Sequence, residues 1–263
     1  MIMEKPVQKL LVEAIGTFTL IFAGCGAIIL TQGQDIVAIA LAHGLAIGVM
    51  VTAAGHISGG HFNPAVTISM LVTGRTEASS AVAYIVAQLV GAVAGAAALT
   101  LTFLDVDRNR VELGLPVVGS SLTADPVVSL SSGNALVMEA ILTFFLVFVI
   151  FGVAVDNRTG GRAIAGLAIG LTITMDILIG GSVSGAAMNP ARWFGPAIVQ
   201  QEFANFWIWI VGPIVGGVAA ALIYNTLMLD RYTPEDEGIS ESLRTTPASE
   251  PPPRSRARRR RKK

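Results

Sequence analysis

The chain has 263 residues, of which 52% are apolar and only 14% are charged, whereas a soluble domain carries about 25% charged residues. Residues 1–229 hold 8 Lys and Arg against 12 Asp and Glu. The last 34 residues hold the other 10 Lys and Arg and the other 6 Asp and Glu. The net charge of zero is therefore the sum of two unlike segments, which excludes an ordinary soluble enzyme and a basic nucleic-acid-binding protein. The single cysteine, Cys25, excludes a disulfide scaffold.

Long runs without Asp, Glu, Lys or Arg follow one another along residues 1–229, and they predict membrane-spanning helices. About 20 mostly apolar residues of helix cross the hydrocarbon core, and the runs lack the alternation of barrel strands. We expect an all-α membrane protein with six spans, at about 8–30, 36–55, 79–104, 134–155, 163–181 and 205–229. Two shorter apolar segments are expected to be re-entrant half-helices, at about 63–74 and 189–200.

Positive charge in the short loops predicts how the spans are oriented. Lys5 and Lys9 precede the first span, Arg75 lies between the second and third, and Arg158 and Arg162 lie between the fourth and fifth. These segments and the basic C-terminal end are expected to be cytoplasmic, so both termini would be cytoplasmic. We therefore expect a multi-pass protein of the cell membrane.

Two halves of the chain repeat each other. The segment EAIxTFxLxF at Glu13 recurs at Glu139, and SGxxxNPA at Ser58 recurs at Ser184, both at an offset of 126 residues. Each copy holds three full spans, so the second must be inverted relative to the first, and inverted repeats place a site near the midplane. The two copies would cover about 8–104 and 134–229. GxxxG spacings predict close helix packing at Gly44/Gly48, Gly91/Gly95, Gly166/Gly170 and Gly212/Gly216.

The tripeptide Asn-Pro-Ala occurs once in each copy. Asn is a preferred N-cap residue and Pro is favoured at the first helical position, so each tripeptide predicts the start of a half-helix. The capping oxygen is engaged, and we expect the amide donors to stay free for a passing oxygen atom. The motif residues are Asn63, Pro64, Ala65, Asn189, Pro190 and Ala191. The carbonyls expected to line a wet cavity belong to Gly59, Gly60, His61, Phe62, Gly185, Ala186, Ala187 and Met188.

With these motifs the sequence resembles the aquaporin, or major intrinsic protein, family over about residues 8–229. The two Asn-Pro-Ala segments, Gln88 and the pair Gly212-Pro213 carry the resemblance. It implies a passive channel that assembles as a homotetramer with one pore per subunit, and it identifies Glu13 and Glu139 with the family's buried structural acids. Such a channel has no cofactor and no metal, and its partners are water, small neutral solutes and membrane lipid.

The resemblance also implies a selectivity filter at His43, Ile177, Ala186 and Arg192. A charge such as Arg192 inside a membrane segment is costly, and facing a pore it repels cations. This set departs from the orthodox water-selective pattern and resembles the plant vacuolar-membrane subgroup. We expect water as the main permeant, driven by osmotic gradients, with protons and ions excluded. The alternative is broader selectivity that includes ammonia, urea, glycerol and hydrogen peroxide.

Two other functional classes find less support. An ion-coupled secondary transporter would need a titratable relay at the midplane, where this chain offers Asn63 and Asn189. A membrane enzyme would need a nucleophile–base pair, a metal-ligand cluster or a phosphate loop, and the sequence shows none of these. We therefore expect that the protein is not an enzyme.

Residues 230–263 differ from the rest of the chain. They are polar, rich in Pro, and end in a run of Arg and Lys. This composition cannot build a core, so we expect a disordered cytoplasmic tail. A basic cluster beside a membrane binds anionic lipid, and we expect no nucleic-acid partner. The chain would thus divide into a channel domain, 1–229, and this tail.

Overall fold

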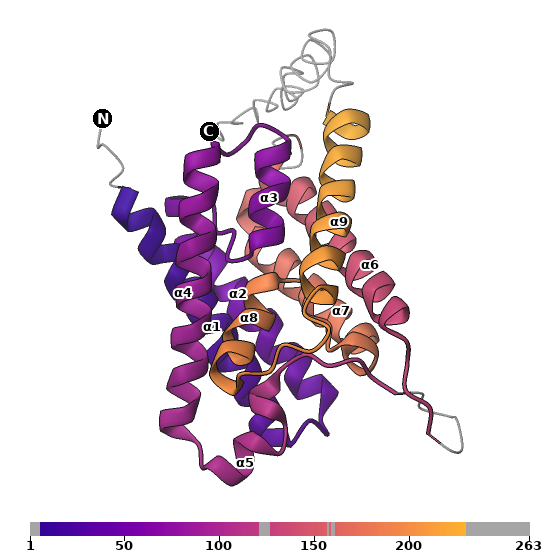
Figure 1. Cartoon of the computed structure of the whole chain (residues 1–263). Helices are drawn as coiled ribbons and strands as arrows, with labels where there is room; N and C mark the ends of the chain where they lie inside the picture. Colours follow the sequence, from indigo (N-terminus) through magenta and orange to yellow (C-terminus); the bar gives the residue numbers. More distant parts are fainter. Residues whose placement is uncertain (1–5, 121–126, 157, 159–160, 230–263) are drawn as a thin grey trace, which may run out of the picture.

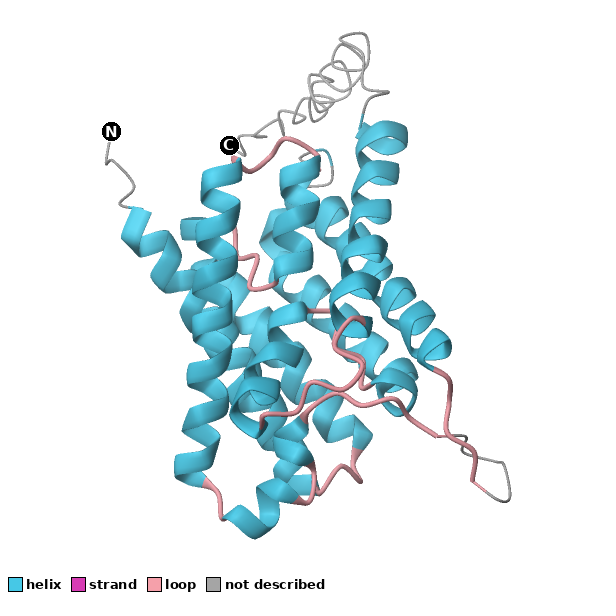
Figure 2. Cartoon of the chain, viewed as in Figure 1, coloured by secondary structure: helices cyan, strands magenta, loops and turns pink. Residues whose placement is uncertain are grey.

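The computed structural model describes residues 6–120, 127–156, 158 and 161–229, and helices dominate this part of the chain (Figure 1, Figure 2). Within these ranges six helices are long and apolar enough to cross a membrane, two of them together with the π-helical segments that continue them. They are α1 (Pro6–Thr31), α2 (Ile36–Ser58), α4 (Ala78–Thr102), α6 (Ser132–Ile150), α7 (Ala165–Ser184) and α9 (Ile208–Ile223). Two further helices are half-helices: α3 (Pro64–Val72) and α8 (Pro190–Gln200). No strand occurs within the described ranges, so the predicted all-α class is confirmed.

Short elements complete the described chain. The helix α5 (Asp105–Asn109) and the 3-10 turn η1 (Glu112–Gly114) follow α4, and another turn, η4 (Gly161–Ile164), precedes α7. Two spans continue as π-helices, α6 into η2 (Phe151–Val155) and α9 into η5 (Tyr224–Leu229). The π-segments extend these spans to the limits that their apolar runs predict.

Helices α2 and α7 run three residues beyond the spans predicted at 36–55 and 163–181. They end at Gly59 and Gly185, whose φ angles of 98° and 78° lie in the left-handed region. A glycine adopts this region without the penalty that a Cβ atom brings. The helices therefore stop at these caps, immediately before the two loops that carry the Asn-Pro-Ala motifs.

Small residues let the long helices approach closely, as the GxxxG spacings predict. A Cβ atom on Gly91 of α4 would lie 2.8 Å from the carbonyl carbon of Ala14 in α1. One on Gly216 of α9 would lie 2.7 Å from that of Ala140 in α6. Ala140 is the repeat counterpart of Ala14, 126 residues later. The same backbone contact thus joins the first and third spans of each repeat.

The molecule is apolar outside and partly polar inside. Large apolar side chains are solvent-exposed on the outer faces of the helices, including Leu45 at 62%, Leu167 at 64% and Ile179 at 67%. Glu13 and Glu139, by contrast, are fully buried at 0% exposure. Soluble proteins almost never bury a carboxylate so completely unless it is paired. This inverted distribution suits a protein surrounded by lipid, and the chain is a multi-pass membrane protein.

The half-helices α3 and α8 begin beside each other between the long helices (Figure 1). From this meeting point α3 leads into α4 and α8 leads toward α9, at opposite ends of the bundle. The inverted repeat therefore places two helix N-termini together in the interior, as the sequence predicts.

Candidate functional site: a pathway between the two repeats

Each half-helix begins at its asparagine cap. The Oδ1 atom of Asn63 accepts a hydrogen bond from the backbone N–H of Ala65 at 2.8 Å, and Oδ1 of Asn189 accepts one from Ala191 at 2.9 Å. A proline occupies the first helical turn in both copies, where its missing N–H costs nothing. The positive ends of two helix dipoles therefore face the same interior point.

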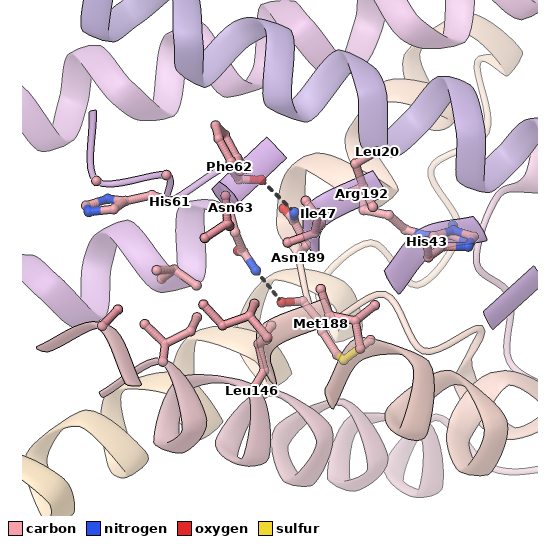
Figure 3. Close-up of a pocket in the computed structure, with 18 of the residues that line it drawn as sticks. Leu20, His43, Ile47, His61, Phe62, Asn63, Leu146, Met188, Asn189 and Arg192 are labelled. Atoms are coloured by element: carbon pink, nitrogen blue, oxygen red, sulfur yellow. Dashed lines mark hydrogen bonds between the residues drawn. The ribbon is translucent and has the colours of Figure 1, made fainter. Parts of the chain in front are cut away.

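The asparagine amides are not wholly free, and this corrects the expectation from sequence. Nδ2 of Asn63 donates to the carbonyl of Met188 at 2.8 Å, and Nδ2 of Asn189 donates to the carbonyl of Phe62 at 2.9 Å (Figure 3). The reason is that a carbonyl of the opposite loop lies within reach of each cap. A side-chain amide has two N–H groups, and in each asparagine one of them ties the two repeats together.

A buried carboxylate holds the first loop. Oε1 of Glu13 accepts hydrogen bonds from the hydroxyl of Ser58 at 2.6 Å and the N–H of His61 at 3.0 Å. Oε2 accepts from the N–H of Phe62 at 2.7 Å and from Nε2 of Gln88 at 2.8 Å. Four donors around one carboxylate satisfy a charge that would otherwise be costly to bury.

The second loop repeats this arrangement. Oε1 of Glu139 accepts from the hydroxyl of Ser184 at 2.7 Å and the N–H of Ala187 at 2.8 Å, and Oε2 accepts from the N–H of Met188 at 2.7 Å. Nε1 of Trp209 donates to the carbonyl of Ser184 at 2.9 Å. The sequence predicted the two acids as structural residues. It missed the serines as their partners, although both belong to the repeated SGxxxNPA motif.

The loops contain non-glycine residues in the left-handed region. Their φ angles are 49° at Phe62, 44° at Ala186 and 54° at Met188. Such conformations cost about 1–3 kcal/mol each and persist only where the surroundings hold them. The carboxylates bond the N–H groups of Phe62 and Met188, and Asn189 and Asn63 bond their carbonyls. This bonding fixes the carbonyl directions on both sides of the interior.

Two cavities, each of about 350 Å³, meet at three residues: His43, Ile177 and Arg192 line both. The first cavity includes both motif asparagines and the predicted filter residue Ala186. Of the predicted backbone residues, it is lined by Gly59, Gly60, His61, Phe62, Ala186, Ala187 and Met188. Gly185 lines the second cavity instead. The structure therefore brings three of the four predicted filter residues to one boundary between two hollow regions, and the fourth, Ala186, lines the first cavity alone.

Two unpaired polar atoms lie at this boundary. Nδ1 of His43 is 2.8 Å from the carbonyl of Ile39, so Nδ1 carries the proton and Nε2 is an acceptor. Nη1 of Arg192 donates to the carbonyl of Gly114 at 2.8 Å. Within the described residues, neither Nε2 of His43 nor Nε of Arg192 has a hydrogen-bond partner. Both atoms are buried, in residues that are 2% and 3% exposed and that line both cavities.

Two features of this region were not predicted. The carbonyl that holds Arg192 comes from Gly114, in a loop where Glu112, Leu113 and Gly114 have φ angles of 47°, 55° and 74°. A backbone contact of this kind leaves no signal in the sequence beyond the glycine. The sequence also assigned no role to Asp176, which is 1% exposed and whose oxygens have no hydrogen-bond partner among the described residues.

Comparisons with known proteins agree with this geometry. Nodulin-26 of Glycine max is 43% identical over 242 residues, covering 90% of this chain and 82% of that protein. Aquaporin NIP1-1 of Zea mays is 44% identical over 225 residues, covering 84% of this chain and 75% of that protein. The X-ray structure of the aquaglyceroporin from Plasmodium falciparum matches with a TM-score of 0.75 at 25% identity, covering 86% and 98% of the two chains.

These relatives include NIP-type aquaporins, so the likeness of the filter to the vacuolar-membrane subgroup stays a prediction. The sequence profile described as Major intrinsic protein matches residues 3–224. With paired half-helices, clamped loops and a shared constriction, the chain therefore belongs to the major intrinsic protein family, whose members are channels and not enzymes.

Proposed function

We propose that the protein is a passive channel for water that also passes small neutral solutes down their gradients. The observation that carries this proposal is the pair of cavities that meet at His43, Ile177 and Arg192. A water molecule that passes this boundary meets the polar side chains of His43 and Arg192, which line both cavities. Beyond the constriction, the remaining amide donors of Asn63 and Asn189 offer the next hydrogen bonds.

Ions are excluded by electrostatics. The positive ends of α3 and α8 meet at the asparagines, and the guanidinium of Arg192 lies at the constriction. A cation or hydronium ion meets both of these positive regions, whereas a neutral molecule does not. The carboxylates of Glu13 and Glu139 are occupied by loop donors, so we assign them a structural role and not a proton relay.

Two observations favour the passage of small neutral solutes beside water. The relatives include NIP-type aquaporins and an aquaglyceroporin. The constriction also carries Ile177 and Ala186, one apolar and one small residue, beside its two polar groups. Such a wall leaves apolar room for the carbon skeleton of a solute such as glycerol or urea.

The assembly and placement of the channel are part of the same proposal. We assign the channel to residues 1–229, with a homotetrameric assembly, cytoplasmic termini and insertion in the cell membrane. The proposed tail, 230–263, lies outside the described residues, and its terminal Arg and Lys run suits anionic lipid.

Reconstitution into liposomes tests the proposal. Stopped-flow measurements should show fast osmotic shrinkage with a low activation energy, entry of urea or glycerol, and no proton current. Ala186→Trp should block these fluxes because its side chain fills the constriction, and Ala94→Trp is the matched control, since Ala94 is exposed on α4. Permeability no higher than that of protein-free liposomes would refute the channel. Solute uptake that stops when an ion gradient is collapsed would indicate a coupled transporter instead.

A further inference from the structure

We propose that Gly24 of α1 is a specificity-determining residue of this channel, although it lines neither cavity. It acts by leaving space for the imidazole ring of His43 and thereby sets how far that ring reaches into the constriction. This inference rests on the proposed function, because it concerns which molecules pass the boundary between the cavities.

The ring of His43 lies directly against the backbone of Gly24. A Cβ atom built on Gly24 would be 2.6 Å from Cε1 of the ring and closer still to Nε2 and Cδ2. Carbon atoms in contact sit at about 3.5–4.0 Å, so even one methyl group would displace the ring by about 1 Å. Both residues are buried, and a close-packed interior does not absorb such a shift freely.

The direction of the displacement follows from what surrounds the ring. Gly24 is on the side away from the cavities, since it lines neither of them and His43 lines both. The hydrogen bond from Nδ1 to the carbonyl of Ile39 tethers the other end of the ring. A ring pushed away from Gly24 therefore moves into the constriction, which Arg192 also lines (Figure 3).

Two consequences follow for a permeating molecule. The opening between His43 and Arg192 becomes narrower, which hinders urea or glycerol more than water. The polar ring of His43 also moves relative to the guanidinium of Arg192, so the two polar groups that line the boundary lose their spacing. The identity of residue 24 thus controls both the size and the polarity of the filter.

A double-mutant cycle tests this coupling. The variants are Gly24→Ala, His43→Ala and the double variant, reconstituted in liposomes and normalised to the protein present. Gly26→Ala is the matched control, because its Cβ atom would meet Leu99 at an ordinary 3.4 Å. We expect Gly24→Ala to lower urea and glycerol permeability by about fivefold or more and water permeability by less. Gly26→Ala should stay within about twofold of the wild type.

The decisive result is the effect of Gly24→Ala when the imidazole is absent. In the His43→Ala background it should change neither the water permeability nor the solute-to-water ratio. A loss of permeability that persists in the His43→Ala background would overturn the inference. So would a Gly24→Ala channel with the wild-type ratio of solute to water permeability. If Gly24→Ala alone fails to fold, the double variant should recover the yield and permeability of His43→Ala. A double variant that did not recover them would also overturn the inference. An impermeable wild type would instead refute the proposed function.

Discussion

Glu139→Gln is the most informative single substitution for the loop that carries the second motif. The wild-type carboxylate accepts from the hydroxyl of Ser184 and from the N–H groups of Ala187 and Met188. Those two N–H groups bind different oxygen atoms, at 2.8 and 2.7 Å. Glutamine keeps the shape of the side chain but offers only one acceptor oxygen, so an amide NH₂ group must face one backbone donor.

The expected cost follows from the bonds that are lost. One buried N–H without a partner costs about 1–3 kcal/mol. The bonds that remain lose the assistance of the negative charge, which makes them roughly half as strong. We therefore expect a loss of about 2–5 kcal/mol in the free energy of unfolding. Since the N–H of Met188 precedes the carbonyl that holds Asn63, water permeability should fall as well.

Unfolding in a detergent titration and stopped-flow permeability measure these two effects. Glu77→Gln is the control, because Glu77 is exposed at the start of α4 and caps no backbone group. If Glu139→Gln unfolded with the wild-type free energy and conducted water at the wild-type rate, the carboxylate would not be holding the loop, and the reasoning would be refuted.

Three further predictions concern charge, thiol chemistry and pH. Arg192→Val should admit protons and small cations, measured with a pH-sensitive dye inside liposomes, and unchanged exclusion would remove Arg192 from the barrier. Mercuric ions should inhibit the wild type weakly because Cys25 is fully buried, whereas Ala186→Cys should be sensitive; strong inhibition that disappears in Cys25→Ser would contradict this. Hydrogen bonds from Arg158 lower the pKa of Asp156 to about 2. A carboxyl group with a lowered pKa stabilises the folded protein at pH values above its ordinary pKa. This stabilisation is lost as the pH falls toward about 2. The difference in melting temperature between wild type and Asp156→Asn should therefore be constant from about pH 5 to 8 and shrink only below about pH 4.

Much of the fold follows from local patterns in the sequence. Charge-free runs locate the spans because lipid tolerates few charges, and Asn-Pro predicts the starts of α3 and α8 because both residues have strong positional preferences. The predicted ends of α2 and α7 were less accurate, since both helices run three residues further. The apolar pattern does not change at Gly59 or Gly185, and only the left-handed backbone at these glycines ends the helices.

The site was predictable where a motif repeats and not where a contact is made by backbone. The repeat identified both asparagines, and the family resemblance supplied the role of both buried acids and the filter positions His43 and Arg192. The carbonyl of Gly114 that holds Arg192 comes from an unrepeated loop, and carbonyl contacts do not depend on side-chain identity. The amide bonds between the loops escaped prediction for the same reason, since their acceptors are main-chain oxygens of the opposite repeat.

The exchanged amide bonds have a consequence for how much chain a conducting unit requires. Asn63 in the first half finds its acceptor in the second, and Asn189 finds its acceptor in the first. Neither half alone would supply the acceptor for the Nδ2 group of its own asparagine or enclose a passage. A chain containing only one half would have to pair with a second copy inserted in the opposite orientation before it could conduct at all.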